Sequence, residues 1–146
     1  MIETIVSEVP ERAIEWNVES LPVISCDGVL VKAVFFNLLS NAVKFTCLRQ
    51  VAVIHVSSSC QNGETILSVA DNGVGFSQQQ AGKLFTVFKR LHPCGDFPGT
   101  GVGLATVKRI IKKHGGRTWA QGEKNGGAKF HFTLLPVPAD LPEIQT

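Results

Sequence analysis

Residues 29–46 read VLVKAVFFNLLSNAVKFT, and this segment carries a clear helical pattern. Apolar side chains recur within it at steps of three and four residues, in the two series Leu30, Val34, Leu38 and Val31, Phe35, Leu39, Ala42. This spacing predicts an amphipathic helix that buries one face. Asp27, just before it, is the expected N-cap.

The segments around this helix carry strand and turn signals. β-branched and apolar runs predict strands over 13–18, 51–57, 65–70, 118–121 and 128–134. Asn62-Gly63 and the stretch EKNGG at 123–127 mark turns between strands. A second amphipathic helix is predicted over 102–114, ending at Gly115-Gly116. We therefore expect an α/β two-layer sandwich, with helices covering one face of a mixed sheet.

Length and composition limit the possible classes of protein. The 146 residues suit one domain, with a core over about 13–135 and a flexible tail at 136–146. The near balance of 14 basic and 12 acidic residues argues against binding nucleic acid or a membrane by charge. No apolar stretch reaches the roughly 20 residues of a membrane span and no signal peptide is evident, so a cytoplasmic domain with reduced cysteines is expected.

Asn37, Asn41 and Lys44 are candidate ligand-binding residues on the first helix. Their steps of four and three residues place them on one face within about two turns. This face is otherwise apolar, so the three polar groups need partners. A magnesium-bound polyphosphate would supply them, because amide oxygens can ligate the ion and an ammonium can meet phosphate. Alternatively, one or both Asn side chains face solvent or bond neighbouring backbone.

The segment DNGVGF, residues 71–76, follows a predicted strand directly. Glycines at 73 and 75 would allow close approach to a flat ligand, and the Asp71 carboxylate would accept a hydrogen bond from an exocyclic amine. Adenine has such an amine where guanine has a carbonyl, so Asp71 would select ATP over GTP. An ordinary turn is the alternative.

The glycine-rich segment GTGVGLA, residues 99–105, opens the second helix. Free backbone N–H groups and the positive end of the helix dipole meet there, which suits a phosphate. The segment is not a P-loop, and Leu104 breaks the dinucleotide fingerprint. An anion cradle and a flexible hinge both remain open.

The long region 71–103 contains little regular pattern and is typical of a functional lid. A short helical pattern at Leu84, Phe85, Phe88 and Leu91 is expected to pack on the core. Arg90, beside it, could reach a terminal phosphate and stabilise charge during transfer. His55, His114 and His131 lie in strand or helix-end patterns and are expected to pack or cap.

Taken in order, these segments resemble the catalytic ATP-binding domain of sensor histidine kinases, within the wider family of Hsp90, gyrase B and MutL ATPases. Four segments are similar to its N, G1, F and G2 boxes: NLLSNAVKFT (37–46), DNGVGF (71–76), LFTVFKRLH (84–92) and GTGVGLA (99–105). The sequence from FKRLH onward is most similar to that of kinases attached to bacteriophytochromes. The resemblance implies a Bergerat fold with a mobile ATP lid over about 77–99.

The resemblance also implies roles for the first helix. Asn41 would ligate Mg²⁺, with Asn37 assisting at the metal or its water. Lys44 would contact phosphate, and Phe45 could stack near the adenine.

For the later motifs, the resemblance implies that Asp71 binds the adenine amine in a pocket shaped by Gly73 and Gly75. Arg90 would approach the γ-phosphate and, with Asn37 and Lys44, would serve catalysis. The phosphate-binding end of the lid would comprise Gly99, Thr100, Gly101, Val102, Gly103 and Leu104.

Two departures from the family pattern bear on activity. Hydrolysing relatives have a glutamate at the position of Asn37 to activate water, and an amide cannot serve as that general base. Phosphoryl transfer to an external acceptor is therefore favoured over hydrolysis. Ala128 follows Gly127 where family members commonly have Ser or Thr. A hydroxyl near the adenine is thus missing, and weaker binding is expected unless backbone groups compensate.

The function expected is transfer of the γ-phosphoryl group of Mg-ATP to a histidine on a separate dimerisation and phosphoacceptor domain, with a response regulator downstream. None of the four histidines here precedes an acidic residue, as the phosphoacceptor does. The isolated chain should then bind ATP without phosphorylating itself. The alternative, which Ala128 favours slightly, is a nucleotide-sensing or interaction module without transferase activity. An Hsp90-type ATPase is a third, which Asn37 disfavours.

Overall fold

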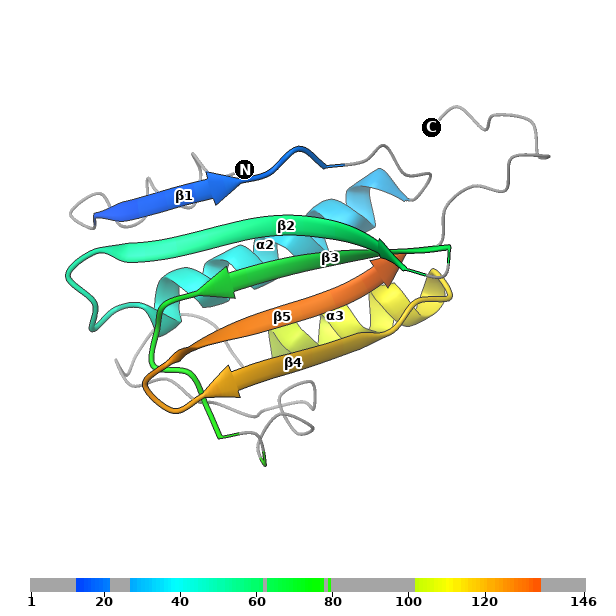
Figure 1. Cartoon of the computed structure of the whole chain (residues 1–146). Coiled ribbons are helices and arrows are strands. Elements are labelled where there is room, and N and C mark those ends of the chain that lie inside the picture. Colours follow the sequence, from blue (N-terminus) through cyan, green and yellow to red (C-terminus); the bar gives the residue numbers. More distant parts are fainter. Residues whose placement is uncertain (1–12, 22–26, 62, 78, 80–101, 135–146) are drawn as a thin grey trace.

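A computed structural model of the chain describes residues 13–21, 27–61, 63–77, 79 and 102–134 (Figure 1). The five strands described form one sheet in the order β1-β2-β3-β5-β4. β1 pairs with β2 in parallel and the other neighbours pair antiparallel, so the predicted mixed sheet is confirmed. The strands are β1 (Ile14–Val18), β2 (Ala52–Gln61), β3 (Glu64–Asp71), β4 (Thr118–Glu123) and β5 (Gly127–Leu134).

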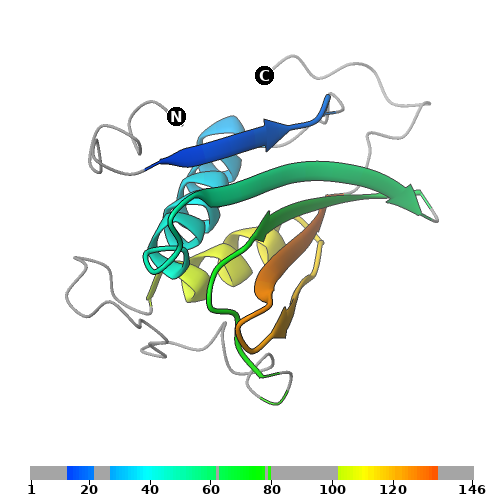
Figure 2. The same cartoon turned by 60° about the vertical axis from the view of Figure 1, so that its left-hand side comes forward.

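Two helices, α2 (Gly28–Phe45) and α3 (Val102–Lys113), lie side by side on one face of this sheet (Figures 1 and 2). They run antiparallel, since the His114 Nε2 just after α3 accepts a hydrogen bond from the Asp27 N–H at the start of α2, at 3.1 Å. The core lies between the layers and is built from side chains such as Leu38, Ile111 and Phe132. This arrangement confirms the two-layer sandwich expected from the sequence.

The first helix forms as its sequence pattern predicts. The Asp27 carboxylate caps it, because its Oδ1 accepts from the N–H groups of Val29 and Leu30, each at 3.1 Å. α2 is long and apolar enough to cross a membrane by length and composition alone, and it is the one such helix among the described residues. Its apolar side is instead covered: Val34 and Leu38 are almost fully buried.

β2 is longer than its sequence predicts. The expected strand ended at Ser57, but the observed strand continues through Gln61 and pairs with β3 as far as Glu64. Ser58 and Ser59 lie in the ladder, paired with Leu67 and Ile66 of β3. Gly63, with a φ of +79°, lies at the turn that joins the two strands.

Several expectations concern segments outside the described residues. These include nearly all of the predicted lid over 77–99, and the tail over 136–146. Among the described cysteines, Cys60 is a free, exposed thiol, but Cys47 is disulfide-bonded. The expectation of reduced thiols is therefore wrong for Cys47, because the spacing of cysteines along a chain does not show which of them meet in space.

Candidate functional site

Three of the predicted ligand-binding segments, as far as the structure describes them, meet at one end of the sandwich. The loop after β3 touches the end of α2, where the Val74 N–H donates to Phe45 O at 3.1 Å. The same loop touches the β4–β5 turn, where the Asn125 N–H donates to Val74 O at 2.6 Å. Because α3 runs antiparallel to α2, its first turn lies at this end as well (Figure 1). Folding thus brings together the described parts of three motifs that are far apart in the sequence.

The two glycines of the loop are required by close backbone packing. A Cβ on Gly73 would lie 2.3 Å from Phe45 O, and a Cβ on Gly75 would lie 2.0 Å from Glu123 O. Gly75 also has a φ of +64°, a conformation that other residues rarely adopt. These glycines therefore let the loop fit between α2 and the β4–β5 turn, and so they shape the site from behind.

Asp71 ends β3 and is 9% exposed. Its Oδ1 accepts a hydrogen bond from the Gly73 N–H at 2.8 Å, whereas its buried Oδ2 has no hydrogen-bond partner in the described part of the chain. Burial raises the pKa of this carboxyl to about 6, against the opposing effect of the backbone N–H groups of Gly73 and Ala128. A buried acceptor without a partner is rare in a native fold and marks a place for a donor.

Ala128 lies directly across the ladder from Asp71. Side chains at such paired positions point to the same face, with Cβ atoms about 4.5–5.5 Å apart. The Ala128 methyl is buried and offers no hydrogen bond to the carboxylate. The departure noted in the sequence therefore lies beside the atom that lacks a partner.

Asn37, Asn41 and Lys44 are all partly buried along α2. The Asn37 Nδ2 donates to Ala33 O at 2.9 Å, so the alternative of bonding to neighbouring backbone holds for its amide nitrogen. Its Oδ1 is left to accept or ligate. The Asn41 side chain makes no hydrogen bond within the described part of the chain, and its oxygen is available in the same way.

Two predicted binding residues lie in the core. The Phe45 ring is 6% exposed and stacks on Phe130 at 6.4 Å, with the planes 10° apart. Phe45 borders the loop through its backbone carbonyl, and the predicted ring stacking near an adenine stays a prediction. Leu104 is 5% exposed in the first turn of α3.

Other members of the predicted phosphate-binding segment are only partly placed. Val102 and Gly103 begin α3, as the sequence predicts for a helix that opens in a glycine-rich segment. Arg90 lies outside the described residues, as do Gly99, Thr100 and Gly101.

Arg49 borders the candidate site but is not among the residues that the sequence predicts there. Its side chain donates three hydrogen bonds to backbone carbonyls around the loop after β3. A lone arginine between a predicted helix and a predicted strand carries no pattern, so no signal in the sequence could have found it.

His131 is a packing residue, as expected, on the open face of the sheet. Its Nε2–H donates to Gln121 Oε1 at 3.1 Å, and its Nδ1 accepts from the Ser68 hydroxyl at 2.7 Å. Burial, aided by the nearby Lys129, lowers the pKa of His131 to about 4. This neutral imidazole borders a polar hollow of about 300 Å³ on the face away from the helices.

The chain matches a known protein family over most of its length. The family described as histidine kinase-, DNA gyrase B-, and HSP90-like ATPase matches residues 26–139. Cyanobacterial phytochrome A of Nostoc sp. is 36% identical over 116 residues, which cover 80% of this chain and 15% of that protein. The chain thus spans a small part of this curated relative.

Solved structures show the same fold. The mycobacterial sensor histidine kinase MprB is 26% identical, with a TM-score of 0.76 over 94% of this chain and 91% of that chain. Full-length ShkA in complex with AMPPNP is 30% identical, with a TM-score of 0.68 over 97% of this chain and 32% of that one. The similarity extends over both helices and the whole sheet.

Proposed function

We propose that this chain, which belongs to the family of histidine kinase-, DNA gyrase B- and HSP90-like ATPases, binds ATP at the end of the sandwich where α2, the loop after β3 and α3 meet. The protein that contains it would be a sensor histidine kinase. In that protein, this domain would transfer the γ-phosphoryl group of ATP to a histidine on a separate dimerisation and phosphoacceptor domain.

The observation that carries the proposal is the Asp71 carboxyl. Its Oδ1 is held by the Gly73 N–H, and its buried Oδ2 has no partner in the described residues. The exocyclic amine of adenine is a donor that fits this acceptor, and the carbonyl of guanine is not. This chemistry supports ATP over GTP as the nucleotide.

A magnesium ion fits the residues on α2. Mg²⁺ prefers oxygen ligands and is usually bound by one or two protein groups together with substrate phosphates. The amide oxygens of Asn41 and Asn37 are of the right kind, and both are left unused by hydrogen bonds among the described residues. When bound, the ion supplies charge neutralisation at the phosphates. Lys44 and Arg90 would add positive charge there.

Phosphoryl transfer to an external acceptor suits the site better than hydrolysis. Asn37 occupies the place of a water-activating base, but a carboxamide has no useful basicity. Its nitrogen also donates to Ala33 O, which fixes the amide orientation. We therefore assign the residues of this chain to binding and positioning, while the acceptor histidine supplies the nucleophile.

A nucleotide-sensing module without transferase activity is the second candidate. Ala128 favours it, because this residue faces Asp71 and lacks the hydroxyl expected there. We further propose that a response regulator is the downstream partner and that the domain lies in the cytoplasm. We propose no contact of this domain with nucleic acid or a membrane.

A labelling experiment tests the proposed transfer. The chain is incubated with γ-labelled ATP and Mg²⁺, alone and with the dimerisation and phosphoacceptor domain of a related sensor kinase. We expect no label on the chain itself, and acid-labile label on the acceptor domain that disappears when its histidine is replaced by Gln. Stable phosphohistidine on the chain would contradict this division of roles. ATP binding without transfer to any acceptor tried would support the sensing module.

A further inference from the structure

Arg49 joins three backbone segments that meet at the candidate site. It lies in the turn that follows α2. Its Nε donates to Asn72 O at 2.7 Å, and one terminal nitrogen donates to both Gly73 O at 3.1 Å and Asn125 O at 3.0 Å. A single guanidinium thus ties the end of α2 to the loop after β3 and to the β4–β5 turn.

The loop after β3 needs such donors. Residues 72–76 lie beyond the end of the strand, so the carbonyls of Asn72 and Gly73 do not bond within a sheet ladder. Hydrogen bonds from a charged guanidinium are stronger than those between neutral groups. From the β4–β5 turn, the Asn125 N–H donates to Val74 O, and Asn125 has a φ of +64°. The loop is therefore held on both sides.

Gly73 connects Arg49 to the Asp71 carboxyl. Its carbonyl accepts from Arg49, and its N–H donates to Asp71 Oδ1 at 2.8 Å. That second bond sets the rotation of the carboxyl and leaves Oδ2 as the acceptor without a partner in the described chain. Arg49 makes no direct bond to the carboxyl, so any influence on it passes through Gly73.

We propose that Arg49 is a positioning residue for adenine recognition. It fixes the backbone at Gly73, and thereby the Asp71 carboxyl, so that Oδ2 faces the exocyclic amine of the base. This inference rests on the proposed function, because it assigns the base to Asp71. A lysine cannot fully replace Arg49, since an ammonium on a flexible stem does not present the planar fork that reaches three carbonyls.

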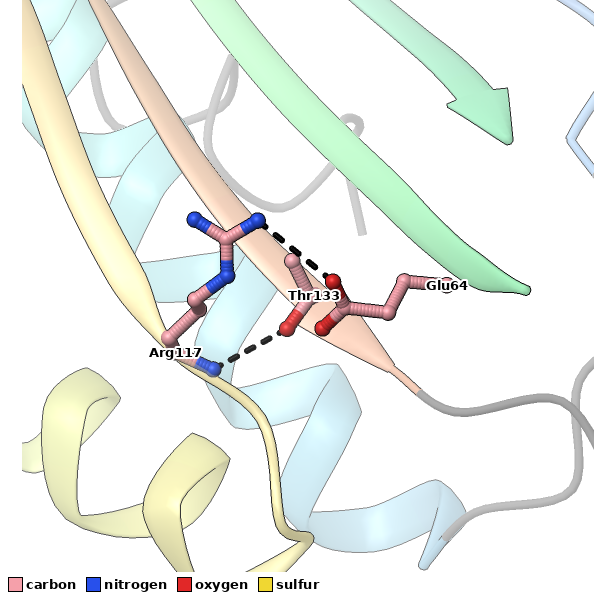
Figure 3. Close-up of polar contacts among 3 residues, drawn as sticks. All are labelled: Glu64, Arg117 and Thr133. Carbon is pink, nitrogen blue, oxygen red and sulfur yellow. Dashed lines mark hydrogen bonds and ion pairs between the residues drawn. The ribbon is translucent and has the colours of Figure 1, made fainter. Parts of the chain in front are cut away.

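Arg117 offers a matched control (Figure 3). It precedes β4, at the opposite end of the sheet from the candidate site (Figure 1). Its side chain is exposed and bonds Glu64 Oε1 at 3.4 Å, while its backbone N–H donates to Thr133 Oγ1 at 3.0 Å. Arg117→Ala therefore removes one arginine and keeps that backbone bond.

The test compares Arg49→Ala, Arg49→Lys and Arg117→Ala with the parent chain, by calorimetric titration with ATP and with tripolyphosphate, which lacks the base. We expect Arg49→Ala to weaken ATP binding about tenfold or more and to change tripolyphosphate binding by less than about twofold. Arg49→Lys should lie between, and Arg117→Ala should match the parent. An unchanged ATP affinity, or an equal loss for both ligands, would overturn the positioning role.

A second readout needs no nucleotide. Amide hydrogen exchange of Gly73 in the ligand-free chain should accelerate about tenfold in Arg49→Ala and stay unchanged in Arg117→Ala. If circular dichroism shows that Arg49→Ala is unfolded, Arg49→Lys carries both tests. Failure of the parent chain to bind ATP would count against the proposed function, whereas unchanged Gly73 exchange would count against Arg49.

Discussion

Replacing Asp71 by Asn is expected to weaken ATP binding by about 1 to 3 kcal/mol, the contribution of a buried hydrogen bond to a charged group. The Asp71→Asn side chain would keep an oxygen for the Gly73 N–H, because Asp71 Oδ1 is the atom that accepts it. At the position of Oδ2 the variant would carry an NH₂ group, which is a donor facing the amine donor of adenine, so no hydrogen bond can form. Calorimetric titration measures the loss, and an unchanged ATP affinity would remove Asp71 from the pocket.

The same substitution should stabilise the ligand-free fold at neutral pH. Burial raises the pKa of the Asp71 carboxyl from 3.8 to about 6, so the folded state binds this proton more tightly than the unfolded state. The carboxylate therefore costs stability that grows as the pH rises from about 4 to 6 and is fully present above 6, at most about 3 kcal/mol. Asn carries no charge at either pH. The increase in unfolding free energy of Asp71→Asn over the parent chain, measured with denaturant, should therefore be larger at pH 8 than at pH 4.

ATP binding should depend on the same proton. The amine of adenine needs the carboxylate form, so protonation of Asp71 below about pH 6 competes with the base. Affinity is expected to fall by up to tenfold for each pH unit below 6. Titration of the phosphates contributes too, and tripolyphosphate measured over the same range corrects for it. In Asp71→Asn, the pH dependence of ATP affinity that remains after this correction should disappear. If it persists in the variant, Asp71 does not bind the base.

Replacing Gly75 by Ala is expected to cost at least about 3 kcal/mol of unfolding free energy, because strain and a backbone clash add. The φ of Gly75 is +64°, and its Cβ would lie 2.0 Å from Glu123 O and 2.6 Å from Gly127 O. Backbone atoms on two strands cannot move aside cheaply. The loop that carries the candidate site should shift with them, so ATP affinity should fall as well.

Gly63 provides the control for this substitution. Its φ is +79°, but a Cβ there would meet nothing within 4 Å. Gly63→Ala should therefore cost only the conformational strain, about 1 to 2 kcal/mol, and leave ATP affinity unchanged. Urea unfolding and calorimetry measure both variants. Equal losses at the two positions would show that close packing at Gly75 contributes nothing.

Local patterns in the sequence predict the elements that they specify completely. α2 combines an apolar period with a capping Asp27, and both appear in the fold. Asp71, Gly73 and Gly75 were found from a short motif, and they meet at one loop. β2 was predicted too short because its serines look like a turn, whereas pairing with residues 64–67 of β3 extends the strand through Gln61.

The features of the site that the sequence does not predict depend on contacts between residues far apart in the chain. Arg49 lies 23 residues from Asn72 and 76 from Asn125, and no local pattern relates them. Phe45 belongs to a motif associated with nucleotide binding, yet its ring stacks in the core on Phe130. The packing reason for Gly75 likewise lies in the β4–β5 turn, so its motif predicts the glycine without the neighbour that requires it.

Calorimetric titration of the chain with ATP, with and without Mg²⁺ and with GTP as competitor, tests whether the chain has an ATP site built on Asp71. We expect one molecule of ATP to bind per chain and Mg²⁺ to strengthen the binding. Excess GTP should leave ATP binding unchanged, because the Asp71 carboxylate and the guanine carbonyl are both acceptors and cannot form a hydrogen bond. Absence of ATP binding, or equal competition by GTP, would contradict an ATP site built on this carboxyl.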